Sequence, residues 1–286
     1  MTETWTGELA GLHIRPGEQA MPAGYALALA DGRRVPLDDR LGQGIRICFK
    51  GVVFCRHCGA ESMQSFGGGY CYECFTNLAR CDLCLVSPDR CHYAAGTCRE
   101  PAWGESFCMQ PHRVYLANSS GLKVGITRAG REVGRWLDQG AIQGLVILAA
   151  ETRRDAGLAE VAIGQQLADR TDWRKMLRAD VPELDLIEAR RRLLESDLSL
   201  PAGVRRVQGE EVVRLSYPLT ATAPPECLWR LEQGDIRGNL KGMKGQYLLL
   251  GRGAFNVRTH AGFRVEVAFG EPEDESADGE QLGLFG

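Results

Sequence analysis

Four side chains between residues 115 and 160 could carry out chemistry together. Tyr115, Lys123, Arg135 and Glu160 provide, in chain order, a phenol, an amine, a guanidinium and a carboxylate. A phenol can act as a general base when a nearby ammonium lowers its pKa from about 10. A guanidinium can hold a phosphate and stabilise the charge of a transition state, and a carboxylate can hold one Mg²⁺ or Mn²⁺ ion. The set therefore fits metal-assisted cleavage of a phosphodiester.

The pattern around these residues predicts the elements that position them. Residues 114–117 and 122–127 flank a turn-forming Asn-Ser-Ser-Gly segment, which predicts a hairpin with Tyr115 and Lys123 on facing strands. Residues 135–137 are expected to open a helix that carries Arg135. Glu160 falls in a helix predicted over 156–168, with its buried stripe at Leu158, Val161, Ala162 and Gln165.

The cysteines indicate metal. Nine of the eleven lie between residues 55 and 108, and such a density in a reducing compartment favours metal ligation over disulfides. Cys55-x2-Cys58 and Cys71-x2-Cys74 have zinc-ribbon spacing, in which two turns each present two thiolates to one tetrahedral zinc ion. This first site is predicted to be structural, because protein side chains fill all four positions.

A second set of candidate ligands follows. It comprises Cys81, Cys84, Cys91, His92, Cys98, Cys108 and His112. A second structural zinc is expected to use Cys81 and Cys84, while its other two ligands stay open among the remaining five residues. The alternative for Cys81-x2-Cys84 is a redox pair, which the absence of a surrounding βαβ pattern disfavours. One or two zinc ions, and more if the ligands divide further, are therefore expected.

The hairpin resembles a known superfamily. Val114-Tyr115-Leu116 followed by Lys123-Val124-Gly125-Ile126-Thr127 is similar to the two motifs of the GIY-YIG nucleases, in the diverged form whose second motif contains lysine. The resemblance implies an arginine on the next helix and a glutamate on a later one, and Arg135 and Glu160 match by order and context. It covers about residues 113–175. The whole chain, including the cysteine pattern and the Tyr115–Lys123 segment, also resembles a prokaryotic family of unknown function.

The whole sequence predicts an α+β protein. Strands are expected at 25–30 and 45–54, at 145–149, and in the C-terminal part at 212–217, 246–250, 257 and 263–269, with an Arg-rich helix at 184–194. The N- and C-terminal β segments are expected to pack on each other. Five parts are predicted: an N-terminal β segment (1–54), a zinc-binding module (55–112), a GIY-YIG-like domain (113–204), a C-terminal β domain (205–270) and an acidic disordered tail (271–286).

Charge and hydropathy narrow the setting. The formal net charge is −3, but residues 271–286 hold six acidic and no basic residues, so residues 1–270 carry +3. A mildly basic body is compatible with nucleic acid. The sequence lacks a run of about 20 apolar residues and a signal-peptide pattern, so we expect a cytoplasmic protein with no membrane association.

The C-terminal residues resemble a docking peptide. Gln281, Leu282, Leu284 and Phe285 are similar to the pentapeptide by which bacterial replication and repair proteins bind the sliding clamp. The glutamine would bond at a pocket rim while the apolar residues fill a groove, and the acidic segment before them would act as a flexible tether.

These observations lead to one hypothesis and two alternatives. The leading hypothesis is a zinc-stabilised, metal-dependent endonuclease that acts on DNA near the replication clamp, with Arg190–Arg192 and Arg205–Arg206 as candidate phosphate contacts. The first alternative is a nucleic-acid-binding or adaptor protein without catalysis. The second is a zinc-stabilised regulator with protein partners only. Cleavage in Mg²⁺ separates the first from the other two.

Overall fold

The chain folds as two compact units with mixed α+β structure. The structure is a computed structural model that describes residues 3–18, 21–167, 172–196, 198–209 and 211–270, and the backbone of Gln281–Leu282. Unit 1 comprises residues 1–75, 177–180 and 216–286, and unit 2 comprises residues 76–176 and 181–215. Each unit holds its own sheet, and the predicted α+β class is confirmed.

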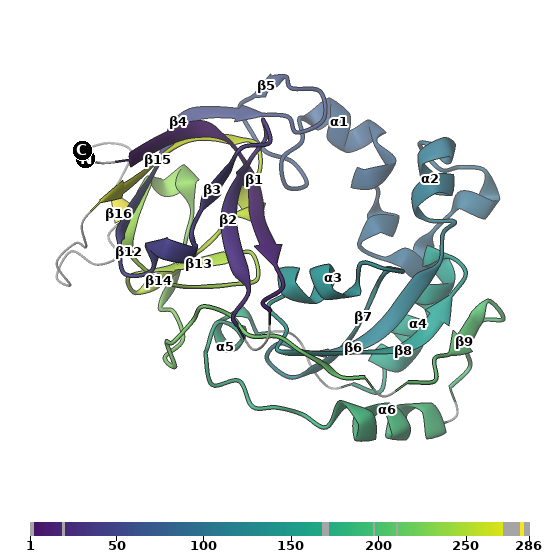
Figure 1. The fold of residues 1–286 in the computed structure, drawn as a ribbon. Coiled ribbons are helices and arrows are strands. Elements are labelled where there is room, and N and C mark those ends of the chain that lie inside the picture. The colour runs from purple at the N-terminus through teal and green to yellow at the C-terminus, as the bar shows by residue number, and fades with distance from the viewer. Residues whose placement is uncertain are drawn as a thin grey trace. The chain divides into compact units, whose positions relative to one another are not determined.

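Unit 1 is built almost wholly from strands (Figure 1). In the described residues these are β1(Glu3–Arg15), β2(Gly24–Leu29), β3(Arg34–Pro36), β4(Gly44–Phe54), β5(Glu61–Ser62), β11(Cys227–Trp229), β12(Asp235–Lys244), β13(Tyr247–Leu250), β14(Gly253–Asn256), β15(Phe263–Gly270) and β16(Gln281–Leu282). Their main order is β11-β14-β13-β12-β4-β15-β1-β2-β3. The helix α1(Tyr72–Asn77) follows the strands of the first segment.

The two ends of the sequence share this sheet. β15 pairs antiparallel with both β1 and β4, so C-terminal residues lie between N-terminal strands. Alternate residues of the paired strands are buried, as Ile45, Ile47, Val265 and Val267 show. The expectation that the flanking β segments pack on each other is therefore confirmed.

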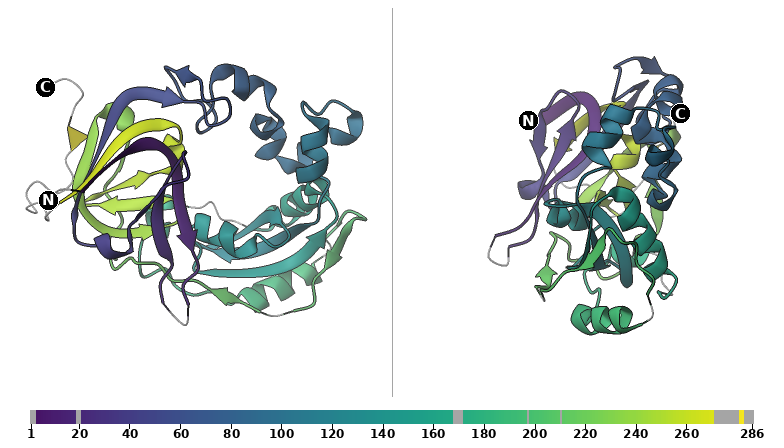
Figure 2. Two further views of the ribbon diagram at one scale, coloured as in Figure 1. Left: turned by 45° about the horizontal axis from the view of Figure 1, so that its top comes forward. Right: turned by 90° about the vertical axis from the view of Figure 1, so that its right-hand side faces the viewer.

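Unit 2 is a small antiparallel sheet covered by helices on both faces. Its strands are β6(His112–Asn118), β7(Leu122–Arg128), β8(Gln143–Ala150), β9(Val204–Arg206) and β10(Val213–Arg214), with the order β10-β8-β6-β7 and β9 beside β8. Its helices in the described residues are α2(Pro101–Phe107), α3(Glu132–Asp138), α4(Arg153–Gly164), α5(Trp173–Met176) and α6(Leu186–Glu195). Figures 1 and 2 show α3 and α6 on opposite sides of the sheet.

The predicted hairpin is present. β6 and β7 pair in a continuous register from His112 opposite Arg128 to Asn118 opposite Leu122. The helices that contain Arg135 and Glu160 are also present, as α3 and α4. Of the C-terminal strands, 212–217 shortens to Val213–Arg214, and Val257 is not a strand residue but precedes a 3₁₀ turn after β14.

Two apolar clusters hold the helices to the sheet. On one face Val114, Leu116 and Ile147 pack with residues of α4 and α6. On the other face Tyr115 and Ala117 pack with Trp136 of α3. Adjacent residues of β6 therefore contribute to different clusters, as the alternation of a strand requires.

The predicted buried stripe of α4 is wrong. Its buried residues are Ala156, Gly157, Ala159 and Ile163, whereas Val161 is 45% exposed. Small residues let the helix axis approach the sheet closely, and the prediction weighted large apolar residues instead. The corrected face determines which side of α4 carries Glu160.

Short turns replace a core in the cysteine-rich part of unit 2. Successive 3₁₀ turns cover Ala79–Cys81, Leu83–Leu85, Pro88–Arg90 and Tyr93–Ala95 before α2 begins. All eleven cysteines are free thiols. Within the described residues, none of the helices has the length and apolar character needed to cross a bilayer.

Candidate active site and metal centres

The first cysteine cluster lies where β4 ends and α1 begins, in unit 1. The sulfur atoms of Cys55, Cys58, Cys71 and Cys74 all lie within 4.8 Å of one another, and those of Cys58 and Cys71 are 3.8 Å apart. In a tetrahedron with Zn–S bonds of about 2.3 Å, the sulfur atoms are roughly 3.8 Å apart. The four thiols are therefore compatible with one structural zinc ion.

Backbone geometry prepares this cluster for thiolates. The Gly59 N–H donates to the Cys55 carbonyl at 2.8 Å, and Gly59 adopts φ 75°, which closes the turn between the first two cysteines. Although burial opposes ionisation of Cys55, backbone N–H groups of Cys58, Cys71 and His57 lower the pKa of its thiol to about 6. These amides favour the charged form that a metal needs.

The remaining cysteine ligand candidates surround a pocket in unit 2. Its lining includes Asp82, Arg99 and four cysteines, namely Cys84, Cys91, Cys98 and Cys108. His92 also lines it, and the ligand atoms of Asp82, Cys84 and His92 lie within 4.8 Å of one another. Cys81, which the spacing pairs with Cys84, is not a lining residue.

His112 also lies away from that pocket lining. It is fully buried on β6, and its ring Nδ1–H donates to the Gln110 carbonyl at 2.7 Å. Burial lowers the pKa of the His112 imidazole to about 4. The residue contributes a neutral buried ring to the start of the central strand.

Tyr115 occupies the middle of the hairpin in unit 2. It is fully buried and lies directly opposite Gly125 of β7. A Cβ atom at position 125 would lie 2.6 Å from the Tyr115 hydroxyl oxygen. The glycine of the second motif is therefore the residue that leaves room for the phenol.

Gln139 connects the phenol to the guanidinium. The Tyr115 hydroxyl donates to Gln139 Oε1 at 3.0 Å. With the amide turned over, its nitrogen donates to the Tyr115 oxygen at 3.0 Å, and its oxygen accepts from Arg135 Nε and Nη2, each at 3.2 Å. The turned orientation satisfies both ends of the amide. Arg135 and Gln139, four residues apart, project from the same side of α3 and its C-terminal end.

Burial controls the ionisation of Tyr115. It raises the pKa of the phenol, while the positive charge and hydrogen bond of Arg135 oppose this shift. The carboxylate of Glu160 raises the pKa further. Tyr115, Arg135 and Glu160 thus act on one another electrostatically, although they come from β6, α3 and α4. The phenol stays protonated at neutral pH in this arrangement.

Glu160 is a largely buried carboxylate. Burial raises its pKa, the charges of Arg153 and Arg135 oppose that shift, and Asp89 adds to it. Arg153 begins α4 and donates through Nη2 to the Leu85 carbonyl at 2.6 Å. Carboxylate oxygens are ligands that a hard cation prefers, whereas the guanidinium groups of Arg153 and Arg135 favour an anion such as a phosphate beside them.

Lys123 lies on the same side of the hairpin as Tyr115. It is opposite Ala117, two residues along the strand from the Tyr115–Gly125 pair, and is partly buried. Diagonal neighbours of this kind are about 7–8 Å apart between Cα atoms. Burial raises the pKa of Tyr115, and the guanidinium of Arg135, rather than the amine of Lys123, lowers that pKa most.

Sequence reasoning missed three residues of this site. Gln139, Arg153 and Asp89 all act on Tyr115 or Glu160. The spacing of Gln139 four residues after Arg135 was a usable signal. Arg153 lies seven residues before Glu160 on α4, a spacing that places both on one side of the helix. Asp89 is distant in sequence, and only the packing of α4 against Pro88–Arg90 brings it near. Arg128, at the end of β7, packs over the Phe107 ring at 4.5 Å.

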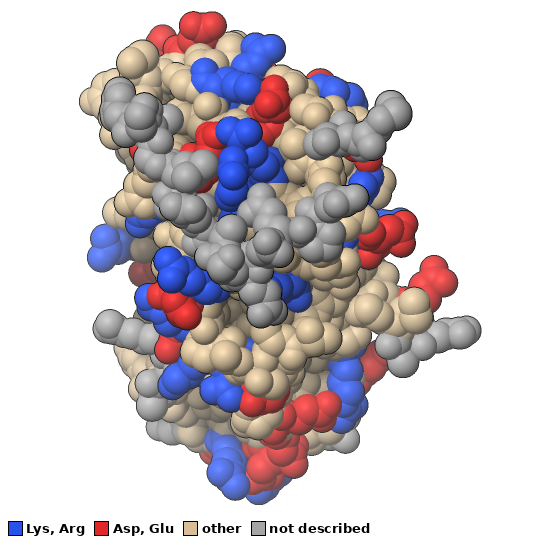
Figure 3. Space-filling model, turned by 90° about the vertical axis from the view of Figure 1, so that its left-hand side faces the viewer, with Lys and Arg blue, Asp and Glu red and all other residues tan. Residues whose placement is uncertain are grey.

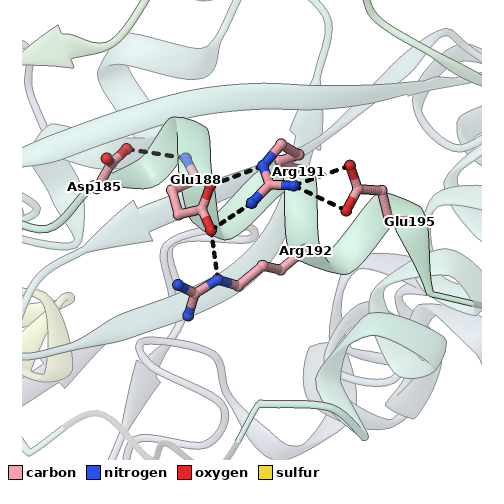
Figure 4. Close-up of polar contacts among 5 residues, drawn as sticks. All are labelled: Asp185, Glu188, Arg191, Arg192 and Glu195. Carbon is pink, nitrogen blue, oxygen red and sulfur yellow. Dashed lines mark hydrogen bonds and ion pairs between the residues drawn. The ribbon is translucent and has the colours of Figure 1, made fainter.

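The arginine-rich helix α6 uses much of its charge internally. Figure 4 shows Arg191 held by Glu188 and Glu195, and Arg192 by Glu188, with ion-pair distances of 2.8, 3.1 and 2.6 Å. Arg206 of β9 donates to the Leu194 carbonyl at 2.6 Å. These contacts favour a solvated, ion-paired surface over a dedicated phosphate-binding face.

Acidic and basic side chains are also mixed on unit 1. Figure 3 shows both signs interspersed over the face that it draws. Strands of this unit carry ion pairs between Arg46 and Asp235 at 2.9 Å and between Lys50 and Glu266 at 3.0 Å. Exposed pairs of this kind contribute little to stability, and they place an acceptor beside each cation.

Comparison with known proteins identifies a family. The sequence model of a family described as "Protein of unknown function (DUF2797)" matches residues 42–265. This range includes both cysteine clusters and the four residues from Tyr115 to Glu160. No curated protein and no solved structure matches the chain.

Proposed function

The chain belongs to the DUF2797 family, and because that family has no assigned activity, we propose from the site itself that unit 2 is a metal-dependent phosphodiesterase that cleaves DNA. The observation that carries this proposal is that Gln139 joins Tyr115 of β6 to Arg135 of α3 by hydrogen bonds, while the charge of Glu160 on α4 acts on both groups. The resemblance of the hairpin to GIY-YIG nucleases supports the same reaction class.

Each residue has a role in the proposed hydrolysis. Arg135 binds the scissile phosphate and stabilises the charge that develops on its oxygens. Tyr115 is the proposed general base, directly or through a second water, a role that requires its phenolate form. Burial raises the pKa of this phenol and Arg135 opposes that rise, so a cation bound at Glu160 would have to favour the phenolate further. Lys123 adds positive charge on the same side of the hairpin. Water attacks phosphorus, the bond to one sugar oxygen breaks, and that oxygen takes up a proton.

Glu160 is the proposed ligand of the catalytic cation. Its carboxylate is the hard oxygen donor that Mg²⁺ or Mn²⁺ prefers, and the nearby carboxylate of Asp89 adds negative charge. A cation held there would supply Lewis-acid stabilisation of the phosphate. The zinc centres have a different role, because a site filled by four cysteines has no open position for substrate.

The tail supports a proposal about location. The backbone of Gln281–Leu282 forms β16, which pairs with Asp235–Ile236 of β12, while Leu284 and Phe285 lie outside the described residues, as does the predicted acidic segment 271–280. We propose that residues 281–285 leave this two-residue pairing and bind the bacterial sliding clamp. Such a short pairing offers few hydrogen bonds to compete with an apolar groove.

Deletion of residues 281–286 tests the recruitment separately from catalysis. The truncated chain should lose clamp binding in a pull-down or by interferometry, and its cleavage of DNA should be unchanged in the absence of clamp. Leu282→Ala with Phe285→Ala should reproduce the loss. Binding by the truncated chain would reject the peptide as the docking element.

A second function is favoured by one specific observation. Tyr115 is fully buried and its hydroxyl is already hydrogen bonded to Gln139, so the phenol has little access to the water molecule that it would have to activate. This burial favours a nucleic-acid-binding protein that retains the fold without cleavage. Binding with a steep salt dependence but without cleavage would support it. Binding of neither DNA nor RNA would favour a regulator that contacts only proteins.

The decisive experiment is nicking of branched, gapped and duplex DNA in Mg²⁺ or Mn²⁺. Tyr115→Phe should reduce the rate by about 100-fold or more, because a positioned base contributes that much. Arg135→Ala should cost about 100- to 1,000-fold, and Glu160→Gln should also raise the cation concentration required. The control is Glu195→Gln, which removes an exposed carboxylate on α6 and should leave the rate unchanged. Equal rates in all variants would reject the assignment.

A further inference from the structure

Four cysteines surround one pocket in unit 2, apart from the first zinc cluster. Cys84, Cys91, Cys98 and Cys108 line it, and they come from two 3₁₀ turns, a loop and the end of α2. Cys84 lies in the Leu83–Leu85 turn, Cys91 ends the Pro88–Arg90 turn, and Cys108 caps the C-terminus of α2. The four cysteines do not share a helix or strand, and the folding of the described chain nevertheless brings all four to the lining of one pocket.

The packing around the thiols is close. Cys108 is 4% exposed. The Cys98 sulfur lies against α2, where it would be 3.1 Å from a Cβ atom at Gly104. Glycine at this position therefore admits the sulfur to the side of the helix. Cys81 is not among the residues that line the pocket.

The two other candidate ligands already have partners. The carboxylate of Asp82 accepts from Arg99 Nε at 2.7 Å and from the Cys84 N–H at 3.2 Å. His92 Nδ1 is 2.8 Å from the Thr97 hydroxyl oxygen, and its Nε2 is 3.6 Å from Asp82. A soft metal that can choose among these donors prefers the thiolates.

We propose that Cys84, Cys91, Cys98 and Cys108 bind a second zinc ion as a closed tetrathiolate centre, and that Cys81, His92 and His112 are not ligands. The ligand atoms of Asp82, Cys84 and His92 lie within 4.8 Å of one another. A tetrathiolate centre therefore requires the sulfur atoms of Cys91, Cys98 and Cys108 to move toward that of Cys84 when zinc binds. Asp82 and His92 then form the polar rim of the centre. This assignment does not depend on the proposed hydrolysis.

The charge balance of the surroundings fits such a centre. Zinc with four thiolates has a net charge of about −2. Arg99 lines the pocket, and Arg153 is a largely buried guanidinium whose Nε has no hydrogen-bond partner in the described part of the chain. The Arg153 backbone N–H donates to the Cys108 carbonyl at 2.8 Å. The Glu160 carboxylate offsets part of the Arg153 charge, and an anionic zinc centre would offset more of it.

The same contacts give the centre a positioning role. Arg153 begins α4, and the turn Pro88–Arg90, between two of the four cysteines, packs against Gly157 of that helix. Glu160 lies one turn further along. The zinc centre therefore fixes the first turns of α4, from which the Glu160 carboxylate is positioned.

Metal content of the full chain tests the ligand set. Wild type should contain about two zinc ions per chain by elemental analysis. Cys91→Ser and Cys98→Ser should each reduce the content to about one, as should Cys58→Ser at the first site. Cys81→Ser, His92→Ala and His112→Ala are the matched controls and should retain both ions. One zinc in wild type, or loss of zinc in Cys81→Ser with retention in Cys98→Ser, would overturn the assignment.

A second measurement avoids variants that fail to fold. Native wild type is alkylated with and without a chelator, and the modified cysteines are mapped by mass spectrometry. Cys84, Cys91, Cys98 and Cys108 should be protected until the chelator is added, while alkylation of Cys81 should not change. Chelator-dependent protection of Cys81, or equal alkylation of Cys98 in both conditions, would reject the proposal. Neither readout requires nuclease activity.

Discussion

At neutral pH Glu160 is a carboxylate whose ionised form is disfavoured by burial. Burial raises the pKa of its carboxylate, and Arg153 and Arg135 only partly oppose the shift. Because the folded pKa lies above the unfolded one, the stabilising contribution is fully present below the unfolded value of about 4.3. It is lost as the pH rises through the folded pKa. An ionised Glu160 at neutral pH therefore costs stability, which a bound cation would recover.

We predict that Glu160→Gln stabilises the protein at neutral pH. The amide removes the charge that burial disfavours, so the variant should gain melting temperature over wild type as the pH rises from 4 to 8, in buffer without added Mg²⁺. Thermal unfolding by circular dichroism at several pH values measures this difference. If Glu160→Gln instead melted at a lower temperature than wild type, and the difference grew with rising pH, the two arginines would outweigh burial.

Glu188 provides a control of opposite sign. Hydrogen bonds from Arg191 and Arg192 lower the pKa of its carboxyl to about 2 (Figure 4). Its contribution is present above the unfolded value of about 4.3 and is lost as the pH falls through the folded value. Glu188→Gln should therefore be less stable than wild type at pH 7, with a difference that shrinks below pH 4. The two variants together separate pH effects on the carboxylates from general acid unfolding.

At this scale the sequence was informative where a motif existed. Tyr115, Arg135 and Glu160 could be chosen because their order matches a known pattern. Gln139 could not, because a glutamine near a helix end is ordinarily a surface residue. Lys123 was expected to lower the pKa of the phenol. In the structure the phenol hydrogen bonds to Gln139, and the charge of Arg135 opposes the rise in its pKa.

At the scale of elements, Gly157 sets how α4 meets the cysteine-rich turns. A Cβ atom there would lie 2.5 Å from Pro88 Cβ and 2.6 Å from the Asp89 backbone nitrogen. We predict that Gly157→Ala destabilises the fold by about 1–3 kcal/mol, the usual cost of overpacking, even though alanine favours helix. Chemical denaturation monitored by tryptophan fluorescence gives the change in unfolding free energy.

Gly134 of α3 is the matched glycine. A Cβ atom at this position meets nothing within 4 Å. Gly134→Ala should therefore stabilise the fold by about 0.5–1 kcal/mol through helix propensity alone. If both substitutions have the same sign, contact with the Pro88–Arg90 turn is not what requires glycine at position 157.

Elements were predictable where local chemistry decides them. The hairpin of β6 and β7 was anticipated because a turn segment separates two apolar runs. The buried face of α4 was not predicted, because Ala156, Gly157 and Ala159 are too small to give a strong hydrophobic pattern. Their role is evident only from the close packing of the helix. β1 and β12 were also missed as strands. β1 carries polar residues such as Thr4, Thr6 and Glu8, and β12 contains two glycines and four charged residues among its ten residues.

At the scale of the whole molecule, each unit has its own cysteine cluster. The division between units falls after Phe75, so Cys55–Cys74 belong to unit 1 and Cys84–Cys108 to unit 2. Sequence spacing groups all nine cysteines in one segment, since only three-dimensional contacts reveal where a compact unit ends. The joining of both chain ends in one sheet was predictable from their shared strand character, but the order of the strands was not.

This division predicts that loss of each cluster acts locally. Cys58→Ser removes one ligand of the first cluster and should speed amide hydrogen exchange in residues 55–75, because that loop has few apolar contacts to hold it. Cys91→Ser should speed exchange in residues 79–108 and at the start of α4, through the Arg153 and Gly157 contacts. Exchange measured by mass spectrometry distinguishes the two patterns.

The two variants serve as controls for each other, since both replace a cysteine with serine and both should retain one zinc ion. The central strands β4 and β15 should keep their protection in Cys91→Ser, and β6 and β8 in Cys58→Ser, because these strands are held by their own apolar clusters. If either substitution instead exposed both sheets together, the chain would unfold as a single cooperative body, and the clusters would stabilise the whole molecule rather than one unit each.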